Sequence, residues 1–176
     1  MIFFDLNEKI FIFINRNLAN PILDFLVLWI LIPFFSLLVL VPFYFLFSKE
    51  KEKRILGFYA LFCGFFLYWL GHSILKPLFN VQRPFVLIEG VRTIGPWHSS
   101  PYSFPSTTTM LAFGLALPIF LRRKKVGKWL LILAFLVGFS VIYTGFHTPF
   151  DVLAGIFFSF VFVLFVDKIL KWRKLE

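Results

Sequence analysis

Long apolar stretches separated by short charged clusters dominate this chain. A helix needs ~20 apolar residues to span the hydrocarbon core of a bilayer, and five stretches approach that length. They cover about residues 21–47, 55–75, 105–121, 126–146 and 149–170, of which the third is short but uncharged. Backbone polar groups in lipid must be hydrogen-bonded internally. We therefore predict an all-α integral membrane protein with a bundle of about five transmembrane helices.

The first 20 residues show a different helical periodicity. Apolar residues recur there at steps of three and four, and charged residues fall mostly between them. This pattern predicts an amphipathic helix lying in the membrane interface, with a sixth, poor span as the alternative. We accordingly divide the chain into an interfacial helix, 1–20, and a transmembrane domain, 21–176, with an outer loop at 76–104.

Composition supports a membrane protein and excludes an ordinary soluble one. Hydrophobic residues make up 60% of the chain, charged residues only 15%, and 28 residues are Phe. A soluble fold of this size could not bury so much apolar surface. The net charge of +9 could suggest nucleic acid, but the basic residues form short clusters between apolar runs. Because no basic groove with interleaved aromatics is evident, we expect no nucleic-acid partner.

The basic clusters predict the orientation of the chain. Thirteen of the 18 lysines and arginines fall on one side of the predicted spans, in clusters at 49–54, 122–128 and 168–174. Cytoplasmic loops are enriched in Lys and Arg. We therefore place the C-terminus in the cytoplasm, and the outer loop and the turn near His147 on the opposite face.

Three polar segments then meet on that outer face. Lys76 and Arg83 offer a point charge and a bidentate fork, which suit phosphate oxygens; anchoring to lipid headgroups is the alternative. Ser106, Thr107 and Thr108 stand where a helix begins, so free N–H groups and hydroxyls could bind an anion. The alternative there is a plain Ser N-cap.

His147 and Asp151 form the third polar segment. They are four residues apart and share a helix face if the helix includes both. Asp151 could then hold one ring nitrogen of His147 and leave the other free as a nucleophile or base. Thr148, Pro149 and Asp151 also match a helix start, and both interpretations can hold together. With few acidic residues outside, we expect no metal.

Together these residues resemble the type 2 phosphatidic acid phosphatase family of membrane lipid phosphatases. The family signature is Lys-x6-Arg-Pro, then Pro-Ser-Gly-His, then Ser-Arg-x5-His-x3-Asp. The positions that match are Lys76, Arg83, Pro84, Pro105, Ser106, Ser140, His147 and Asp151. The resemblance implies His147 as the nucleophile that forms a phosphohistidine, Asp151 as its orienting partner, and Lys76, Arg83 and Ser106 as phosphate ligands, without a cofactor.

The chain departs from the signature at two places. Thr107 and Thr108 replace the Gly-His of the second part, and Val141 replaces the Arg of the third. In the family that His protonates the leaving group, and its loss could cost ~10²–10⁴ in rate. One hypothesis is that His98 or Arg92, in the outer loop, supplies the missing groups. The other is a substrate whose leaving group needs little protonation.

We therefore predict a phosphatase that acts on a membrane lipid phosphate at the periplasmic face of a bacterial inner membrane. Candidate substrates are a polyprenyl diphosphate, the 1-phosphate of lipid A and a phospholipid phosphate; the sequence indicates no particular protein partner. The alternative is a catalytically impaired relative that binds a lipid phosphate or supports a membrane partner. The departures favour this alternative, whereas the retained His147 and Asp151 favour the enzyme.

Overall fold

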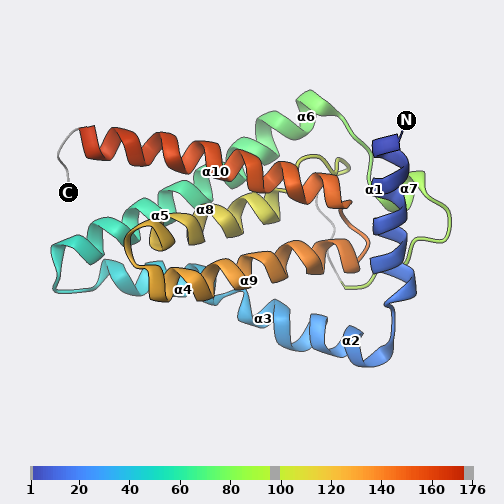
Figure 1. Ribbon diagram of the computed structural model, residues 1–176, viewed down its shortest axis with the longest axis horizontal. Coiled ribbons are helices and arrows are strands. Elements are labelled where there is room, and N and C mark those ends of the chain that lie inside the picture. The colour runs from blue at the N-terminus through green and yellow to red at the C-terminus, as the bar shows by residue number, and fades with distance from the viewer. Residues whose placement is uncertain (1, 96–99, 173–176) are drawn as a thin grey trace.

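The helices of this protein run side by side in a bundle that another helix crosses at one end, as the computed structural model shows (Figure 1). It describes residues 2–95 and 100–172. The elements are α1 (Ile2–Ile12), η1 (Phe13–Asn17), α2 (Pro21–Phe25), η2 (Leu26–Leu31), α3 (Ile32–Phe34), α4 (Leu37–Leu46), α5 (Lys51–Leu70), η3 (Gly71–Leu75), α6 (Lys76–Phe79), α7 (Pro84–Leu87), α8 (Thr107–Arg122), α9 (Lys124–Tyr143) and α10 (Pro149–Trp172), with η marking short π-helical segments.

The five predicted spans are confirmed as helices. Among the described residues, four runs are long and apolar enough to cross a bilayer, at Pro21–Leu46, Lys51–Phe79, Lys124–Tyr143 and Pro149–Lys171, and Thr107–Arg122 is a shorter apolar helix. The second run is longer at both ends than the predicted 55–75. It starts within the basic cluster and continues through η3 into α6, because long basic side chains can reach water while their backbone stays helical.

The short helix α8 forms the centre of the bundle. It packs against α5, α9 and α10, and most of its side chains are buried, including Met110, Phe113 and Ile119. A Cβ atom added at Gly114 would lie 2.8 Å from the Cα atom of Gly64 on α5, so glycine permits this close helix contact. Because α8 is enclosed by protein, it does not need the length of a lipid-facing helix.

The outside of the bundle is apolar. Trp29, Trp129 and Phe157 have 71%, 71% and 62% of their surfaces exposed, and many other aromatic and aliphatic side chains are exposed along the same helices. Such a continuous apolar surface marks an interaction with lipid or protein rather than with water. This surface and the helical bundle confirm the predicted class, an all-α membrane protein.

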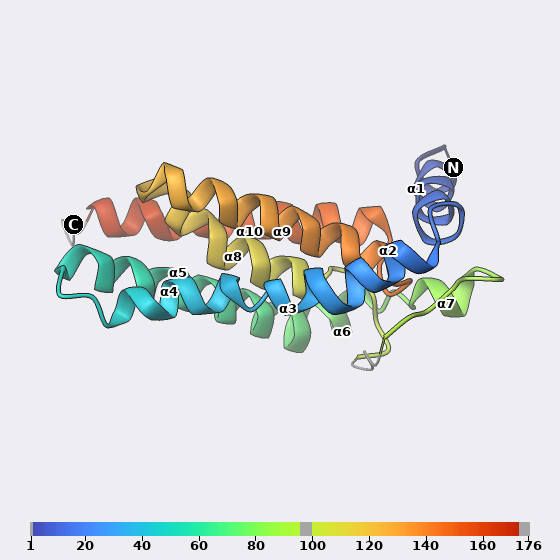
Figure 2. The same ribbon diagram turned by 90° about the horizontal axis from the view of Figure 1, so that it is seen from below.

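The N-terminal helix lies across the end of the bundle. It runs across the direction of the other helices in Figure 1 and is seen nearly end-on in the view from below (Figure 2). Leu6, Ile10 and Phe13 are 52%, 40% and 54% exposed, whereas Phe11 and Asn15 are fully buried. This placement favours the interfacial helix over a sixth span. The apolar stripe seen in the sequence faces away from the protein, and a different stripe faces the bundle.

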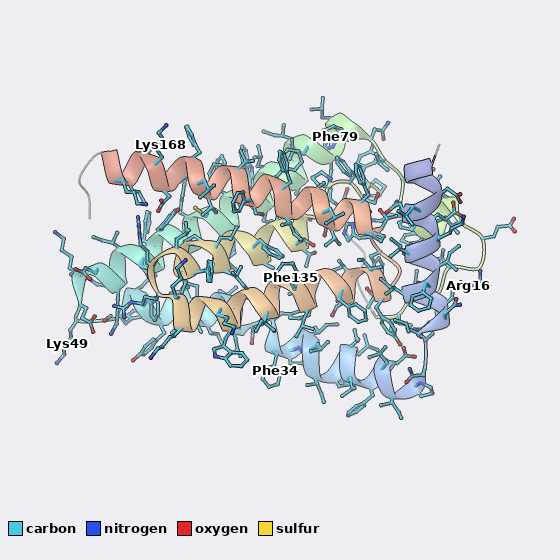
Figure 3. The ribbon with its side chains drawn as sticks, viewed as in Figure 1. Arg16, Phe34, Lys49, Phe79, Phe135 and Lys168 are labelled. Carbon is cyan, nitrogen blue, oxygen red and sulfur yellow. The ribbon has the colours of Figure 1, made fainter. Side chains whose placement is uncertain are left out.

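The described residues of the basic clusters gather at the end of the bundle opposite α1, and Arg173 and Lys174 lie outside the described residues. Lys49 and Lys168 extend there, and Arg16 lies at the other end (Figure 3). Ion pairs join the clusters, since Arg123 lies 3.3 Å from Glu50 and Arg122 lies 2.8 Å from Asp167. The grouping of basic residues at one end, predicted from their order in the sequence, is present in the structure.

Candidate active site

The three polar segments converge at the end of the bundle that α1 crosses. The backbone N–H of Ser106 donates to the carbonyl oxygen of Asp151 at 3.0 Å, which joins the start of α8 to the first turn of α10. Nη1 of Arg83 lies 3.2 Å from Nε2 of His147. Lys76 lies close enough to interact electrostatically with Arg83, Asp151 and His147. The proposed site residues are therefore neighbours in space.

A tight turn between α9 and α10 carries His147. Gly145 has a φ of +86°, a conformation that costs glycine little. The turn ends in a capping box, in which the N–H of Thr148 donates to Oδ2 of Asp151 at 2.7 Å and the N–H of Asp151 donates to Oγ1 of Thr148 at 3.3 Å. The predicted helix start is therefore present, and Asp151 is held in place by it.

The imidazole of His147 is almost fully buried. Its side chain is 4% exposed, and Nδ1 lies 3.6 Å from Oδ2 of Asp151, beyond hydrogen-bond range, without another partner. Arg83 can only donate, so Nε2 accepts from it and Nδ1 carries the proton that faces Asp151. This tautomer leaves the reactive lone pair on Nε2. Hydrogen bonds of this kind are often long before a substrate binds.

Burial also keeps His147 neutral. It lowers the pKa of His147 to about 4, against the opposing effect of Asp151, and the positive charges of Arg83 and Lys76 lower that pKa further. At neutral pH the ring therefore carries no charge. An uncharged imidazole is the form that can attack an electrophile.

Two cations are buried beside His147 without being hydrogen-bonded to a carboxylate. Lys76 is 1% exposed and donates through Nζ to the carbonyl oxygen of Tyr102 at 2.6 Å. Arg83 is 5% exposed and donates through Nη2 and Nε to the carbonyl oxygen of Ser100, at 3.0 and 3.2 Å. It also donates to the carbonyl oxygen of Phe146 at 2.9 Å. Carbonyl dipoles stabilise these cations but leave their net charge for an anion.

The start of α8 confirms the capping interpretation of Ser106. Its Oγ accepts from the N–H of Thr109 at 3.3 Å and from the hydroxyl of Thr109 at 2.9 Å. Thr107 is buried and Thr108 is exposed. The capping role does not remove the anion-binding role, because the N–H groups of the first turn remain unpaired within the helix.

A cavity of about 270 Å³ opens beside His147. Both departures from the family signature line it, Thr108 on α8 and Val141 on α9, together with Arg83 and His147. The remaining lining residues are Ile32, Phe35, Thr107, Ser140, Thr144 and Phe146. Lys76, Ser106 and Asp151 do not line this cavity. The positions that carry a His and an Arg in the family signature therefore face the same space.

The structure does not bring Arg92 into this group. Its Nη1 lies 2.8 and 2.7 Å from the two carboxylate oxygens of Asp24, and its guanidinium lies 5.1 Å from the ring centroid of Tyr143. His98 lies outside the described residues. Among residues 2–95 and 100–172, no group of three or more His, Cys, Asp or Glu side chains could hold a metal ion.

Sequence reasoning missed Asn7 and Asn15 of the N-terminal helix. Asn15 is fully buried and hydrogen-bonds to the backbone of Arg92 and Tyr143. Asn7 accepts from the N–H of Phe150 at 2.9 Å. The available signal was their spacing, since Asn7 and Asn15 are eight residues apart on one helix face with Phe11 between them, but neither Asn was assigned a role from the sequence.

Known proteins resemble this chain over most of its length. The protein named bacitracin transport permease protein BcrC, from Bacillus licheniformis, is 34% identical over 171 residues, which cover 94% of this chain and 81% of that protein. The undecaprenyl-diphosphatase BcrC of Bacillus subtilis is 34% identical over 124 residues, covering 68% of this chain and 62% of its own.

Solved structures share the same fold. The crystal structure of LpxE from Aquifex aeolicus matches with a TM-score of 0.69 and 31% identity, covering 93% of this chain and 95% of that one. A PAP2-type phosphatidylglycerolphosphate phosphatase from Bacillus subtilis matches with a TM-score of 0.65 over 93% of this chain and 85% of its own, at 21% identity. The second likeness supports the fold alone.

The family match covers the part of the chain that builds this site. The model of the PAP2 superfamily matches residues 52–175, which include all three polar segments. The relatives agree with it in sequence, and the solved structures agree with it in fold. The resemblance read from the three motifs is thereby confirmed, and the chain belongs to the PAP2 superfamily of membrane lipid phosphatases.

Proposed function

We propose that this protein hydrolyses a lipid-linked phosphate through a phosphohistidine formed on His147, at the outer face of a bacterial cytoplasmic membrane. The observation that carries the proposal is the state of His147. The ring is buried and neutral, Nε2 meets Arg83 at 3.2 Å, and Nδ1 faces Asp151 at 3.6 Å. A binding site for an anion alone would not need a neutral imidazole oriented in this way.

The reaction follows from these positions. Phosphate oxygens take the donors of Arg83 and the charge of Lys76, which frees Nε2 of His147. The Nε2 lone pair then forms a P–N bond as the P–O bond to the leaving group breaks, and the leaving group departs with the bonding electrons. Asp151 stabilises the positive imidazole. Water next attacks phosphorus, releases inorganic phosphate and restores neutral His147.

The missing general acid decides which substrates react. Thr108 stands where the family carries a His, and a hydroxyl is too weak an acid to protonate an alkoxide at neutral pH. Losing a general acid costs ~10²–10⁴ in rate when the leaving group needs a proton. A polyprenyl diphosphate expels a polyprenyl phosphate anion, and a glycosyl phosphate such as lipid A 1-phosphate expels the oxyanion of a sugar hemiacetal; both are less basic than a simple alkoxide. We therefore expect both to be hydrolysed faster than phospholipid phosphates.

The location follows from the distribution of charge. The site lies at the end of the bundle opposite the clustered basic residues, and those clusters favour the cytoplasm. The catalytic end therefore faces the periplasm or the exterior, and the C-terminus is cytoplasmic. A lipid phosphate reaches such a site by lateral diffusion in the outer leaflet.

The second candidate function is binding of a lipid phosphate without turnover. The cavity beside His147 supports this candidate. It is lined by Thr108 and Val141, which stand where the family signature has the general-acid His and a second Arg. Losing one charged transition-state donor costs a few kcal/mol. This candidate leaves the neutral His147 beside Asp151 without a role, which places it second.

Phosphate release by the purified protein in detergent tests the proposal. The substrates are a polyprenyl diphosphate, lipid A, phosphatidic acid and phosphatidylglycerol phosphate, with His147→Ala as the matched control. We expect release from the first two, at least ~10²-fold faster than from phosphatidic acid, and none from the variant. Equal rates on all substrates would contradict the leaving-group argument. Release no faster than that of a folded His147→Ala protein would favour the binding function.

A further inference from the structure

One face of the N-terminal helix carries Asn7, Phe11 and Asn15. These residues are four apart, so they lie in one stripe along the helix, and the stripe faces the bundle. Phe11 is fully buried and packs in a cluster with Ile142 of α9 and Val152 of α10. The helix is therefore seated across the ends of the two elements that flank the His147 turn.

Asn15 holds the end of α9. Its Nδ2 donates to the carbonyl oxygen of Tyr143 at 2.9 Å and to that of Arg92 at 2.7 Å. Its Oδ1 accepts from the N–H of Arg92 at 2.9 Å. Tyr143 is the last residue of α9, four before His147. Every hydrogen-bonding atom of the Asn15 amide is thus used on the backbone, and both of its amide hydrogens are needed.

Asn7 holds the start of α10. Its Oδ1 accepts from the N–H of Phe150 at 2.9 Å, one of the first N–H groups of α10, which have no partner within their own helix. Phe150 comes three residues after His147. The two asparagines therefore bind the backbone on either side of the turn that carries the imidazole, and Asn7 uses only an acceptor.

The outer loop completes this attachment. The N–H of Ile94 donates to the carbonyl oxygen of Thr144 at 3.3 Å. A Cβ atom added at Gly145 would lie 2.4 Å from the carbonyl oxygen of Arg92 and 3.2 Å from Nδ2 of Asn15. The turn is pressed against the loop and the helix with no room for a side chain at that position.

We propose that Asn15 and Asn7 are positioning residues, by which the N-terminal helix holds the His147 turn in the geometry that phosphoryl transfer needs. The inference rests on the proposed function for its catalytic consequence, and on the hydrogen bonds for its structural one. The helix then does more than lie on the membrane, because it fixes the backbone on both sides of the reacting side chain.

If the His147 turn becomes less firmly held, we expect the pKa of His147 to change. The charged groups that face this ring are Asp151 on α10, Arg83 before α7 and Lys76 on α6. Burial dominates their combined effect and lowers the pKa of His147 to about 4. A turn freed from Asn15 lets water reach the imidazole, so the pKa of His147 should rise toward its ordinary value near 6.5.

The same substitution at two positions gives the test. Asn15→Asp removes the two amide donors and places carboxylate oxygens against two carbonyls. We expect kcat for a polyprenyl diphosphate to fall ~10–100-fold with KM within about threefold, as for a misplaced reacting group. Asn7→Leu removes the acceptor and should lower kcat ~3–10-fold. Asn7→Asp keeps the acceptor and should restore kcat to within about twofold of the wild type.

Asn17→Asp is the matched control, because Asn17 is exposed on the same helix. Imidazole NMR titration of His147 in the same detergent gives a readout that does not depend on turnover. If the wild type releases no phosphate, the proposed function fails. A raised pKa of His147 in Asn15→Asp would then still support the inference that Asn15 holds the His147 turn. Normal kcat and unchanged titration in Asn15→Asp would overturn the inference. Should Asn15→Asp not fold, equal behaviour of Asn7→Leu and Asn7→Asp would overturn it instead.

Discussion

The two ends of the bundle use positive charge in opposite ways. At the end with the basic clusters, several cations are paired with carboxylates, since Asp167 lies 2.8 Å from Arg122 and 3.0 Å from Lys171. At the end with His147, Lys76 and Arg83 are buried and hydrogen-bonded to backbone carbonyls. The first arrangement neutralises charge, and the second preserves it at a desolvation cost.

This difference separates structural cations from candidate functional ones. Arg92 lies at the same end as His147, yet its Nη1 donates to both carboxylate oxygens of Asp24, and it follows the pattern of the opposite end. A phosphate would have to compete with that carboxylate for Arg92. It would meet no such competitor at Arg83, whose partners in the structure are carbonyls and the neutral ring of His147. A buried cation without a paired carboxylate is therefore the feature that marks the candidate anion site.

Removing one cation from each end is the strongest test of this comparison. Arg83→Met should lower the rate of phosphate release by ~10²–10³, because it removes a donor that stabilises transition-state charge. Arg123→Met, at the exposed pair with Glu50, should change the rate by less than about twofold. Both rates are measured on a polyprenyl diphosphate. Comparable losses in the two variants would show that the two ends do not differ in function.

Introducing the two missing residues of the family signature beside His147 should change which substrates react fastest. In the double variant Thr108→His, Val141→Arg, the cavity gains a general acid and a second arginine. We expect hydrolysis of phosphatidic acid to rise ~10–100-fold, while hydrolysis of a polyprenyl diphosphate changes much less. The ratio of the two rates is the measurement. An unchanged ratio would mean that the leaving group does not limit the present enzyme.

The pH dependence of turnover should reveal the burial of His147. Attack requires the neutral ring, and burial lowers the pKa of His147 to about 4. As the pH falls from 7 to 5 the ring stays neutral, so kcat at saturating substrate should change by less than about twofold. It should fall only as the pH approaches about 4. An acid limb near 6.5 would indicate an exposed imidazole.

The smallest effect on catalysis is expected at the opposite end. Asp167 is nearly buried and binds two cations, so Asp167→Asn should destabilise the fold by about 1 kcal/mol. That corresponds to a lower melting temperature by ~2–4 °C, with kcat per folded molecule unchanged. A thermal melt and an assay on the same sample provide both values. A large loss of kcat would connect this ion pair to the site.

Much of the fold and of the site was predictable because membrane helices are specified locally. Apolar runs of the right length predicted all five spans, and the order of basic clusters grouped them at one end. The polar segments around Lys76, Ser106 and His147 were predicted to converge from topology alone, and they do. Phosphate binding by Thr107 and Thr108 remains a prediction.

The remaining features depend on partners distant in the sequence. Asp24 pairs with Arg92 across 68 positions, and Asn15 bonds to Tyr143 across 128. No periodicity reveals such contacts. The apolar stripe of the N-terminal helix, which includes Leu6 and Ile10, is exposed in the structure, and its contact with lipid remains a prediction. The stripe that binds the protein was not predicted. A buried Asn side chain needs hydrogen-bond partners, and here only the assembled fold provides them.

Helices α8 and α10 pack in parallel, and polar contacts join them near both of their ends. Ser106 meets Asp151 at one end, and Arg122 meets Asp167 at the other, sixteen residues further along each helix. At 1.5 Å per residue these polar layers are ~24 Å apart, whereas a bilayer core measures ~30 Å. Because Ser106, Asp151 and Asp167 are buried, their hydrogen bonds and ion pairs are made within the protein, and both polar layers can lie inside the hydrocarbon core without contacting lipid.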